Sequence, residues 1–277
     1  MVTFPNCKIN LGLNVIRKRE DGYHELQTVF YPIDVCDALE LIKHNDEPQE
    51  DIQFLTTGIP INGNSKDNLC IKAYRLLKKD FTQLAAIKMH LHKVIPMGAG
   101  LGGGSADAAF TLLLLNKKFQ LNLSADQLIN YALQLGSDCP FFIINKPCYA
   151  QGRGEMLEEI ELNLSSYQLI IVNPRIDIST RWAFSKIQPV IPAINIKQIV
   201  KQPVETWKEQ LINDFEKPLV QYYPKLKSLK DELYGQGALY AGMSGSGSTF
   251  FGIFPASKKI DTNIFPQEYF IRLINKK

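Results

Sequence analysis

Pro96-Met-Gly-Ala-Gly-Leu-Gly-Gly-Gly-Ser-Ala-Asp-Ala-Ala109 is the stretch of sequence that decides the fold. Five of the seven residues from 98 to 104 are glycine, and the residues from about Ser105 onward predict a helix. Because glycine lacks a Cβ atom, such a loop can adopt positive φ and bring backbone N–H groups close to an oxyanion. The helix adds further N–H groups and the positive end of its dipole. The stretch therefore predicts a phosphate-binding loop.

Two familiar phosphate loops do not match this stretch. No Gly-Lys-Ser/Thr closes it, so it is not a Walker A loop, and its spacing differs from that of the dinucleotide fingerprint. A flexible linker is the structural alternative. The strand-like residues 87–91 before the loop and the apolar residues 106–115 after it argue against a linker.

The composition limits the class of protein. A chain of 277 residues that is 45% hydrophobic can form one large domain or two small ones. A net charge of +3 from 31 basic and 28 acidic residues gives no reason to expect a nucleic-acid partner. The five cysteines are odd in number and include no C-x-x-C pair, so we expect reduced, mostly buried thiols.

Neither a leader nor a membrane span is indicated. The N-terminal residues enter a strand pattern almost at once, and the apolar run from Phe110 to Leu115 is too short to cross a bilayer. We therefore expect a soluble, cytoplasmic protein.

Hydrophobic periodicity predicts mixed α and β structure. Residues 9–15 alternate as in a half-buried strand that carries Lys8 and Asn10. Asn68 is a predicted N-cap, and Ser124 with Gln127 has the spacing of a capping box whose helix ends at Gly136. Further strands are expected at 38–43, 51–56, 167–172, 238–243 and 249–254, and residues 182–233 favour helices broken by prolines. We place a domain boundary near residue 155.

Four more segments extend the pattern of the glycine loop. They are Pro5-Asn-Cys-Lys-Ile-Asn-Leu11, Asp21-Gly-Tyr-His24, Gly136-Ser-Asp-Cys-Pro140 and Ser244-Gly-Ser-Gly-Ser248. Together with the loop, in this order and over nearly the whole chain, they resemble the GHMP small-molecule kinases. The Asp-Gly-Tyr-His segment close behind Lys-Ile-Asn is similar to the branch that acts on a cytidine diphosphate derivative of methylerythritol.

The resemblance implies a two-domain α+β fold. An N-terminal ATP-binding domain of the ribosomal-protein-S5-like type would span residues 1–155, and a ferredoxin-like C-terminal domain would span 156–277. The implied reaction transfers a phosphoryl group from ATP, with Mg²⁺, to the 2-hydroxyl of that derivative in the non-mevalonate pathway of isoprene biosynthesis. The implied partner is this small molecule alone, and the protein would be a monomer or a homodimer.

The expected nucleotide site centres on the glycine loop. Its backbone would hold the triphosphate through Pro96, Met97, Gly98, Ala99, Gly100, Leu101, Gly102, Gly103, Gly104 and Ser105. The Ser105 hydroxyl could reach Mg²⁺ or a phosphate oxygen, and a plain helix N-cap is its structural alternative. The resemblance alone places Asn68, Lys93 and Met97 around the adenine.

Phosphoryl transfer also needs an alcohol that is oriented and relieved of its proton. Asp138 lies two residues before Pro140, and its pattern by itself favours a helix cap. The resemblance assigns Asp138 the role of general base and gives it Lys8 as a partner that keeps the carboxylate ionised. Taken alone, Lys8 would be read as a surface lysine.

The resemblance also indicates the substrate side. Tyr23 and Phe184 would sandwich the cytosine, and His24 would bond its edge. A hairpin turn and core packing are the structural alternatives for these residues. Other implied contacts are Thr180, Asn10, Gly245, Ser246 and Gly247, near the phosphates or the methylerythritol, although a β-turn also explains 244–248.

Departures from the family pattern are small and lie at Cys7, Ser137 and Cys139. Two rival functions stay open at this point. The chain could be another kinase of the same family, acting on homoserine, mevalonate or a sugar, or a binding protein that has lost catalysis.

Overall fold

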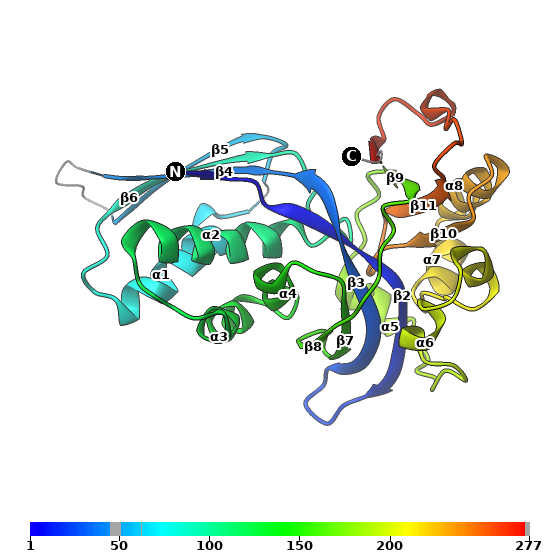
Figure 1. The fold of residues 1–277 in the computed structure, drawn as a ribbon, viewed down its shortest axis with the longest axis horizontal. Coiled ribbons are helices and arrows are strands. Elements are labelled where there is room, and N and C mark those ends of the chain that lie inside the picture. The colour runs from blue at the N-terminus through cyan, green and yellow to red at the C-terminus, as the bar shows by residue number, and fades with distance from the viewer. Residues whose placement is uncertain (45–50, 62, 275–277) are drawn as a thin grey trace. The chain divides into compact units, whose positions relative to one another are not determined.

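The computed structural model describes residues 1–44, 51–61 and 63–274 (Figure 1). The chain forms two compact units, each assembled from three segments. Unit 1 contains Met1–Cys7, Asp34–Met97 and Gly102–Lys146, and unit 2 contains Lys8–Ile33, Gly98–Leu101 and Pro147–Lys277. The chain thus passes between the units several times, and the domain boundary at residue 155 stays a prediction.

Unit 1 is a four-stranded sheet with helices packed on one face (Figure 1). The strands lie in the order β1 (Val2–Thr3), β4 (Ala38–Lys43), β6 (Ile87–Lys93) and β5 (Ile52–Gly58), and only the β5–β6 pair among them is parallel. The helical elements are η1 (Ser65–Asp67), α1 (Leu69–Asp80), α2 (Gly103–Phe119), α3 (Ala125–Leu135) and α4 (Cys139–Ile144). The strands predicted at 38–43 and 51–56 are confirmed.

Alternation along β6 explains how this sheet builds its core. Ile87, Met89 and Leu91 are buried and join the cluster formed with α1 and α2. The imidazoles of His90 and His92 lie on the other face, where each is hydrogen bonded to the Thr57 hydroxyl, at 2.8 and 2.9 Å.

Two predicted helix starts are confirmed in detail. The Asn68 side chain accepts a hydrogen bond from the Cys70 N–H at 2.9 Å and begins α1. Ser124 and Gln127 form both bonds of the capping box, and Gly136 ends α3. These caps are local features, which is why the sequence alone predicts them.

The start of the helix after the glycine loop differs from the prediction. Helix α2 begins at Gly103, and Ala106 donates the first helical hydrogen bond to the carbonyl of Gly102 at 2.9 Å. Gly102 is the N-cap, with a φ of +69°. The N-cap interpretation of Ser105 is therefore wrong, because Ser105 lies inside the first turn.

Unit 2 contains two four-stranded sheets. One has the order β2 (Asn6–Lys18), β3 (His24–Cys36), β7 (Cys148–Gly152) and β8 (Met156–Glu159), and β2 and β3 each extend by a few residues into unit 1. The other is antiparallel, with the order β10 (Tyr240–Met243), β11 (Phe250–Pro255), β9 (Tyr167–Asn173) and β12 (Phe270–Ile274). The predicted strands at 167–172, 238–243 and 249–254 are confirmed.

Short helices fill the sequence between β9 and β10, as the proline-broken pattern predicts. They are α5 (Thr180–Ser185), α6 (Ile196–Ile199), η2 (Val204–Glu209), α7 (Glu216–Tyr222) and α8 (Pro224–Gly235), and η3 (Thr262–Ile264) follows β11. Helices α5, α7 and α8 pack on the second sheet through a shared apolar cluster.

Strand β2 corrects one prediction. Alternation predicts a half-buried strand, but every residue from 6 to 15 is buried. The apolar side chains enter the core, while Lys8, Asn10 and Asn14 are buried through polar contacts on the other face. Period-two alternation cannot distinguish a solvated polar face from a buried polar network.

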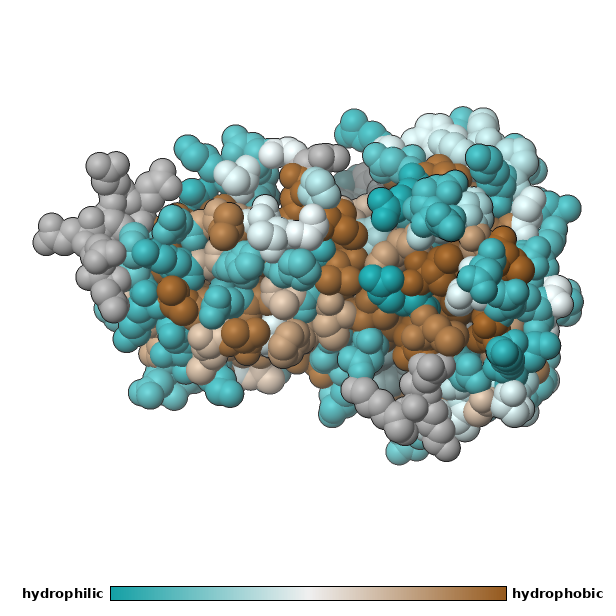
Figure 2. All heavy atoms as spheres, turned by 90° about the horizontal axis from the view of Figure 1, so that it is seen from above, coloured by the Kyte–Doolittle hydropathy of each residue, from teal (hydrophilic) through white to brown (hydrophobic). Residues whose placement is uncertain are grey.

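The prediction that most cysteines are buried is confirmed, because four of the five, all among the described residues, are buried and Cys36 is half-buried. Among the described residues, no helix has the length and apolar character that crossing a membrane requires. Apolar areas lie between hydrophilic side chains on the face that Figure 2 shows. Apolar surface of this kind is ordinary for a folded protein.

Candidate active site

The glycine loop has the backbone conformation that its sequence predicts. Gly98, Gly100 and Gly102 have φ values of +63°, +77° and +69°, which residues with side chains rarely adopt. The loop leads directly into the first turn of α2, whose N–H groups have no partners within the helix. This arrangement can bind an anion through backbone donors.

Gly100 also makes a close backbone approach. A Cβ atom at this position would lie 2.0 Å from the carbonyl oxygen of Ser244. The glycine loop and the 244–248 turn are therefore in direct contact within unit 2, and the turn lies between β10 and β11 as expected.

Lys8 is buried, which contradicts its interpretation as a surface lysine. Its side chain projects from β2, the residue is only 3% exposed, and its Nζ donates to Asn10 Oδ1 at 2.5 Å and to the Gly100 carbonyl at 3.2 Å. The ammonium also lies 4.9 Å from the centroid of the Phe30 ring. The structure thus brings Lys8, Asn10 and the glycine loop together.

Asn10 completes this network from the same strand. Its amide Nδ2 donates to Thr28 Oγ1 at 3.0 Å, and its backbone N–H donates to the Ser244 hydroxyl at 3.2 Å. Thr28 was missed at the sequence level, and Ser244 was noted only as part of the 244–248 segment, because the contacts of a single buried hydroxyl leave no pattern in a sequence.

Asp138 stands at the N-cap position of α4, but its side chain does not cap that helix. The next residue, Cys139, is buried, and burial raises the pKa of its thiol to about 12, opposed by a hydrogen bond with the Ser105 side chain. The contact between Ser105 and Cys139 brings Ser105 to the start of α4 within unit 1. Lys8 belongs to unit 2, so its partnership with Asp138 stays a prediction.

The side chain of Lys93 has a different environment from the one that the resemblance implies. Its Nζ donates to Asp107 Oδ2 at 2.7 Å and also to Asp37 Oδ2, and all three residues are buried. Burial alone would lower the pKa of Lys93, but Asp107 and Asp37 raise it. A contact of Lys93 with adenine stays a prediction.

The two carboxylates beside Lys93 were also missed. Asp37 Oδ1 accepts hydrogen bonds from the backbone N–H groups of Val94 and Ile95, at 2.5 and 2.8 Å, just before the glycine loop. Asp107 lies among alanines in α2, and a lone acid on an apolar helix face was the signal that could have found it.

The other two residues predicted around the adenine are Asn68 and Met97. Asn68 uses its side chain to cap α1, as described above. Met97 is 48% exposed, and its Cε would lie 3.2 Å from a Cβ atom at Gly104, so the thioether covers the first turn of α2.

Two aromatic contacts appear among the residues predicted for the base. The rings of His24 and Phe184 are stacked, with centroids 4.7 Å apart at an angle of 22°. Phe184 also contacts Phe215 edge to face, with centroids 4.8 Å apart. Burial and the nearby Lys18 lower the pKa of His24, which favours the neutral ring.

Tyr23 contacts a different residue from the His24–Phe184 stack. Its ring is exposed, and the Arg153 guanidinium lies 4.9 Å from its centroid. Arg153 was missed, since a lone surface arginine carries no distinguishing pattern.

The structure brings Thr180 and Ser246 together, with 3.3 Å between their hydroxyl oxygens.

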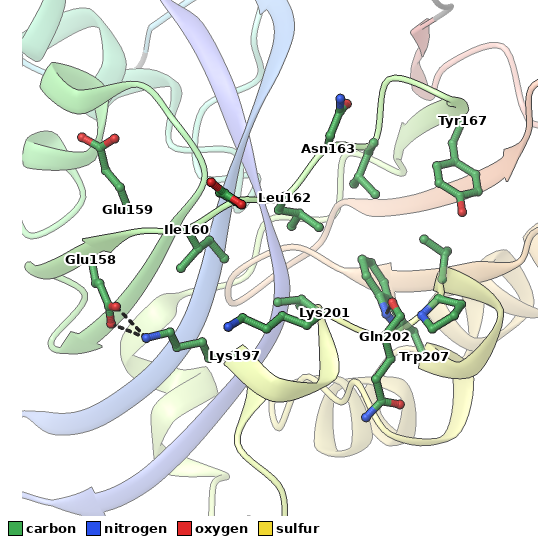
Figure 3. Close-up of a pocket in the computed structure, with 15 residues that line it drawn as sticks. Glu158, Glu159, Ile160, Leu162, Asn163, Tyr167, Lys197, Lys201, Gln202 and Trp207 are labelled. Carbon is green, nitrogen blue, oxygen red and sulfur yellow. Dashed lines mark hydrogen bonds and ion pairs between the residues drawn. The ribbon is translucent and has the colours of Figure 1, made fainter.

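A pocket of about 790 Å³ lies elsewhere in unit 2 (Figure 3). It is lined by residues of the segments 158–167 and 197–207, including an ion pair between Lys197 and Glu158 with 2.6 Å between Nζ and Oε1. No residue predicted for the active site lines this pocket.

Two parts of the chain match family models of known proteins. Residues 68–146 match the family model described as GHMP kinases N terminal domain, and residues 196–266 match that described as GHMP kinases C terminal. Two similar proteins are each named 4-diphosphocytidyl-2-C-methyl-D-erythritol kinase. The one from Bacteroides fragilis (strain YCH46) is 52% identical over 94% of both chains, and the one from Bacteroides thetaiotaomicron is 54% identical over 92% of both.

Solved structures give the same result. A crystal structure of 4-(cytidine 5'-diphospho)-2C-methyl-D-erythritol kinase matches with a TM-score of 0.79 and 31% identity, covering 91% of this chain and 90% of that one. The mevalonate kinase of Methanococcus jannaschii matches with a TM-score of 0.73 at 14% identity, which indicates a shared fold. The predicted α+β GHMP fold is confirmed.

Proposed function

This chain belongs to the 4-diphosphocytidyl-2-C-methyl-D-erythritol kinases of the GHMP family, and on that premise we propose which of its residues carry the reaction. The protein is an ATP-dependent kinase. We propose that it phosphorylates the 2-hydroxyl of 4-diphosphocytidyl-2-C-methyl-D-erythritol, with Asp138 as general base and Lys8 as the cation that supports it.

One observation carries the assignment of Lys8. Lys8 is only 3% exposed, and burying an ammonium group costs free energy unless hydrogen-bond acceptors or an opposite charge compensate for the lost water. Two acceptors, Asn10 Oδ1 and the Gly100 carbonyl, hold its ammonium in one place beside the glycine loop. Such an ammonium can stabilise negative charge on a reacting oxygen or a nearby carboxylate without reorganising.

Asp138 is suited to accept a proton from the alcohol. Its carboxylate is partly exposed and is not used to cap α4, although the residue stands at the N-cap. Removing the proton as the hydroxyl attacks phosphorus is the step that this group would perform.

The glycine loop and the start of α2 would hold the phosphates. The positive φ values of Gly98, Gly100 and Gly102 support this role, because they allow consecutive N–H groups to face one anion. The oxygens of Ser105 and Asp138 are of the kind that Mg²⁺ prefers, and the Ser105 contact with Cys139 places both at the start of α4. When bound, Mg²⁺ would offset the negative charge of the phosphates.

The stacked His24 and Phe184 rings support recognition of the cytosine. A base has a flat face that stacks on an aromatic ring and an edge that a neutral imidazole can bond. We propose that Thr180 and Ser246 bond the substrate's phosphates, which the 3.3 Å separation of their hydroxyl oxygens supports.

The test is the release of ADP from Mg-ATP in the presence of this alcohol, with homoserine, mevalonate and galactose as parallel substrates. We expect release with the cytidyl substrate alone, and loss of about 10² to 10⁴ of the rate in Asp138→Asn, as expected for a missing general base. Release with another alcohol would refute the substrate assignment. Near-normal turnover in Asp138→Asn would remove that residue from the mechanism.

A further inference from the structure

Ser244 connects the 244–248 turn to the glycine loop through its side chain. The residue is fully buried at the end of β10. Its hydroxyl donates to the Gly100 carbonyl at 2.8 Å and accepts the Asn10 backbone N–H at 3.2 Å. A fully buried hydroxyl with these partners faces the loop and not the solvent.

The Gly100 carbonyl receives a second donor. The Nζ of Lys8 also donates to it, at 3.2 Å, so both of its acceptor positions are occupied. The next carbonyl, that of Leu101, accepts the backbone N–H of Lys8 at 3.0 Å. Two successive carbonyls of the loop are therefore held toward β2.

This arrangement fixes where the loop's donors point. In a trans peptide the N–H is directed opposite to the C=O of the same peptide unit. The N–H groups of Leu101 and Gly102 therefore face away from β2, and neither donates to another residue in the described part of the chain. Two adjacent free amides that share one direction are suited to bind an oxyanion.

The turn that carries Ser244 is itself anchored. The side chain of Asn213 donates to the carbonyls of Met243 and Gly245, at 2.8 and 2.9 Å. The Ser244 N–H donates to the Thr249 carbonyl at 2.9 Å, which closes the turn between β10 and β11. The backbone that carries Ser244 is therefore held in place, and so is the hydroxyl that donates to the Gly100 carbonyl.

We propose that Ser244 is a positioning residue for the nucleotide, although it belongs to the segment expected to serve the other substrate. By holding the Gly100 carbonyl inward together with Lys8, it orients the Leu101 and Gly102 amides toward the phosphates of ATP. This role of Ser244 depends on one part of the proposed function, namely that the glycine loop binds ATP. It does not depend on which alcohol is phosphorylated.

The experiment compares Ser244→Ala with Ser248→Ala. Ser248 is a matched control, because it is a buried serine of the same turn whose hydroxyl donates instead to the Ile176 carbonyl, at 2.6 Å. The dissociation constant of ATP is measured by calorimetry on each variant, and unfolding midpoints show what each substitution costs in stability. Steady-state KM values for ATP and for the cytidyl substrate are measured alongside.

We expect Ser244→Ala to bind ATP roughly five- to tenfold more weakly, as for the loss of one hydrogen bond of about 1 to 1.5 kcal/mol. The KM for ATP should rise more than the KM for the cytidyl substrate, and Ser248→Ala should bind ATP like the wild type. Unchanged ATP affinity in Ser244→Ala, or an equal loss in both variants, would overturn the proposal. If the wild type binds ATP but turns over a different alcohol, the proposed substrate fails while this comparison still stands.

Discussion

The ammonium of Lys93 lies 2.7 Å from the carboxylate of Asp107, and neither side chain has appreciable contact with solvent. Asp37 holds the same ammonium and, with its other oxygen, the backbone of Val94 and Ile95. One buried cation thus joins the strand before the glycine loop to the helix after it. We infer that this cluster sets the geometry of both ends of the loop.

Replacing Lys93 by methionine should strongly destabilise the protein. The substitution leaves two buried carboxylates without their cation, and breaking a buried pair in this way typically costs about 3 to 5 kcal/mol. Urea unfolding at pH 8 measures the loss. Lys197→Met is the control, because its pair with Glu158 is partly exposed and should contribute at most about 1 kcal/mol. Equal losses in the two variants would contradict this account.

Asp107 should make the stability of the protein depend on pH. Burial raises its pKa to about 7 in the folded state, from an ordinary value of 3.8, and the neighbouring Asp37 adds to the rise while Lys93 opposes it. Between these two values the folded state holds a proton that the unfolded state has released. Stability contributed by this group therefore falls as the pH rises from about 4 to about 7.

The measurement for this prediction is the free energy of unfolding at pH 5, 6, 7 and 8, for the wild type and for Asp107→Asn. The amide does not titrate, so the variant should lose less stability than the wild type as the pH rises through this range. The raised pKa of Lys93 belongs to a more alkaline range and does not disturb the comparison. Parallel profiles would show that Asp107 stays ionised throughout.

Features encoded by neighbouring residues could be predicted from the sequence. The caps at Asn68 and Ser124 and the strands 167–172 and 249–254 depend on a few adjacent positions, and the structure confirms them. The start of α2 could not be placed correctly, because a serine and a glycine are both acceptable caps. Only the bond from Ala106 to Gly102 decides between them.

The polar networks of the site lay beyond sequence reasoning for a different reason. Lys93 and Asp37 are separated by 56 residues, and Ser244 and Gly100 by 144, so no local pattern links them. The family resemblance supplied Lys8 and Asn10 but not the hydroxyl that connects them to the loop. A residue such as Ser244, which contacts the loop and not the ligand, belongs to no sequence motif that predicts its role.

Gly100 should not tolerate a side chain. Gly100→Ala would combine a φ of +77° with a Cβ placed 2.0 Å from the Ser244 carbonyl oxygen. We expect ATP affinity to fall by more than about tenfold, since the loop must move away from its anchoring donors. Calorimetric titration with ATP measures the effect.

Gly22→Ala is the control that separates the effect of backbone strain from the steric clash between a Cβ atom at residue 100 and the Ser244 carbonyl oxygen. Gly22 has a similar φ of +82°, but no atom lies within 4 Å of a Cβ built there. Its replacement should cost about 1 to 2 kcal/mol of stability through strain alone and leave ATP binding as in the wild type. If Gly100→Ala behaves like Gly22→Ala in both measurements, the close approach to Ser244 is not a constraint.

Phe184 should affect recognition of the cytidyl substrate and not of ATP. Phe184→Leu keeps an apolar side chain but removes the aromatic face that now stacks on His24. Because stacking of a base on an aromatic ring is worth about 1 to 3 kcal/mol, the KM for the cytidyl substrate should rise roughly five- to 150-fold. The KM for ATP should change little.

Trp182→Leu is the matched control for this substitution. Trp182 lies on the same short helix, but its ring contacts Tyr222 and Tyr223 edge to face. A rise in KM that is specific to Phe184→Leu identifies the ring as part of the base site. If both variants raise the KM equally, the effect comes from loosening α5. If neither does, Phe184 serves only to pack on Phe215.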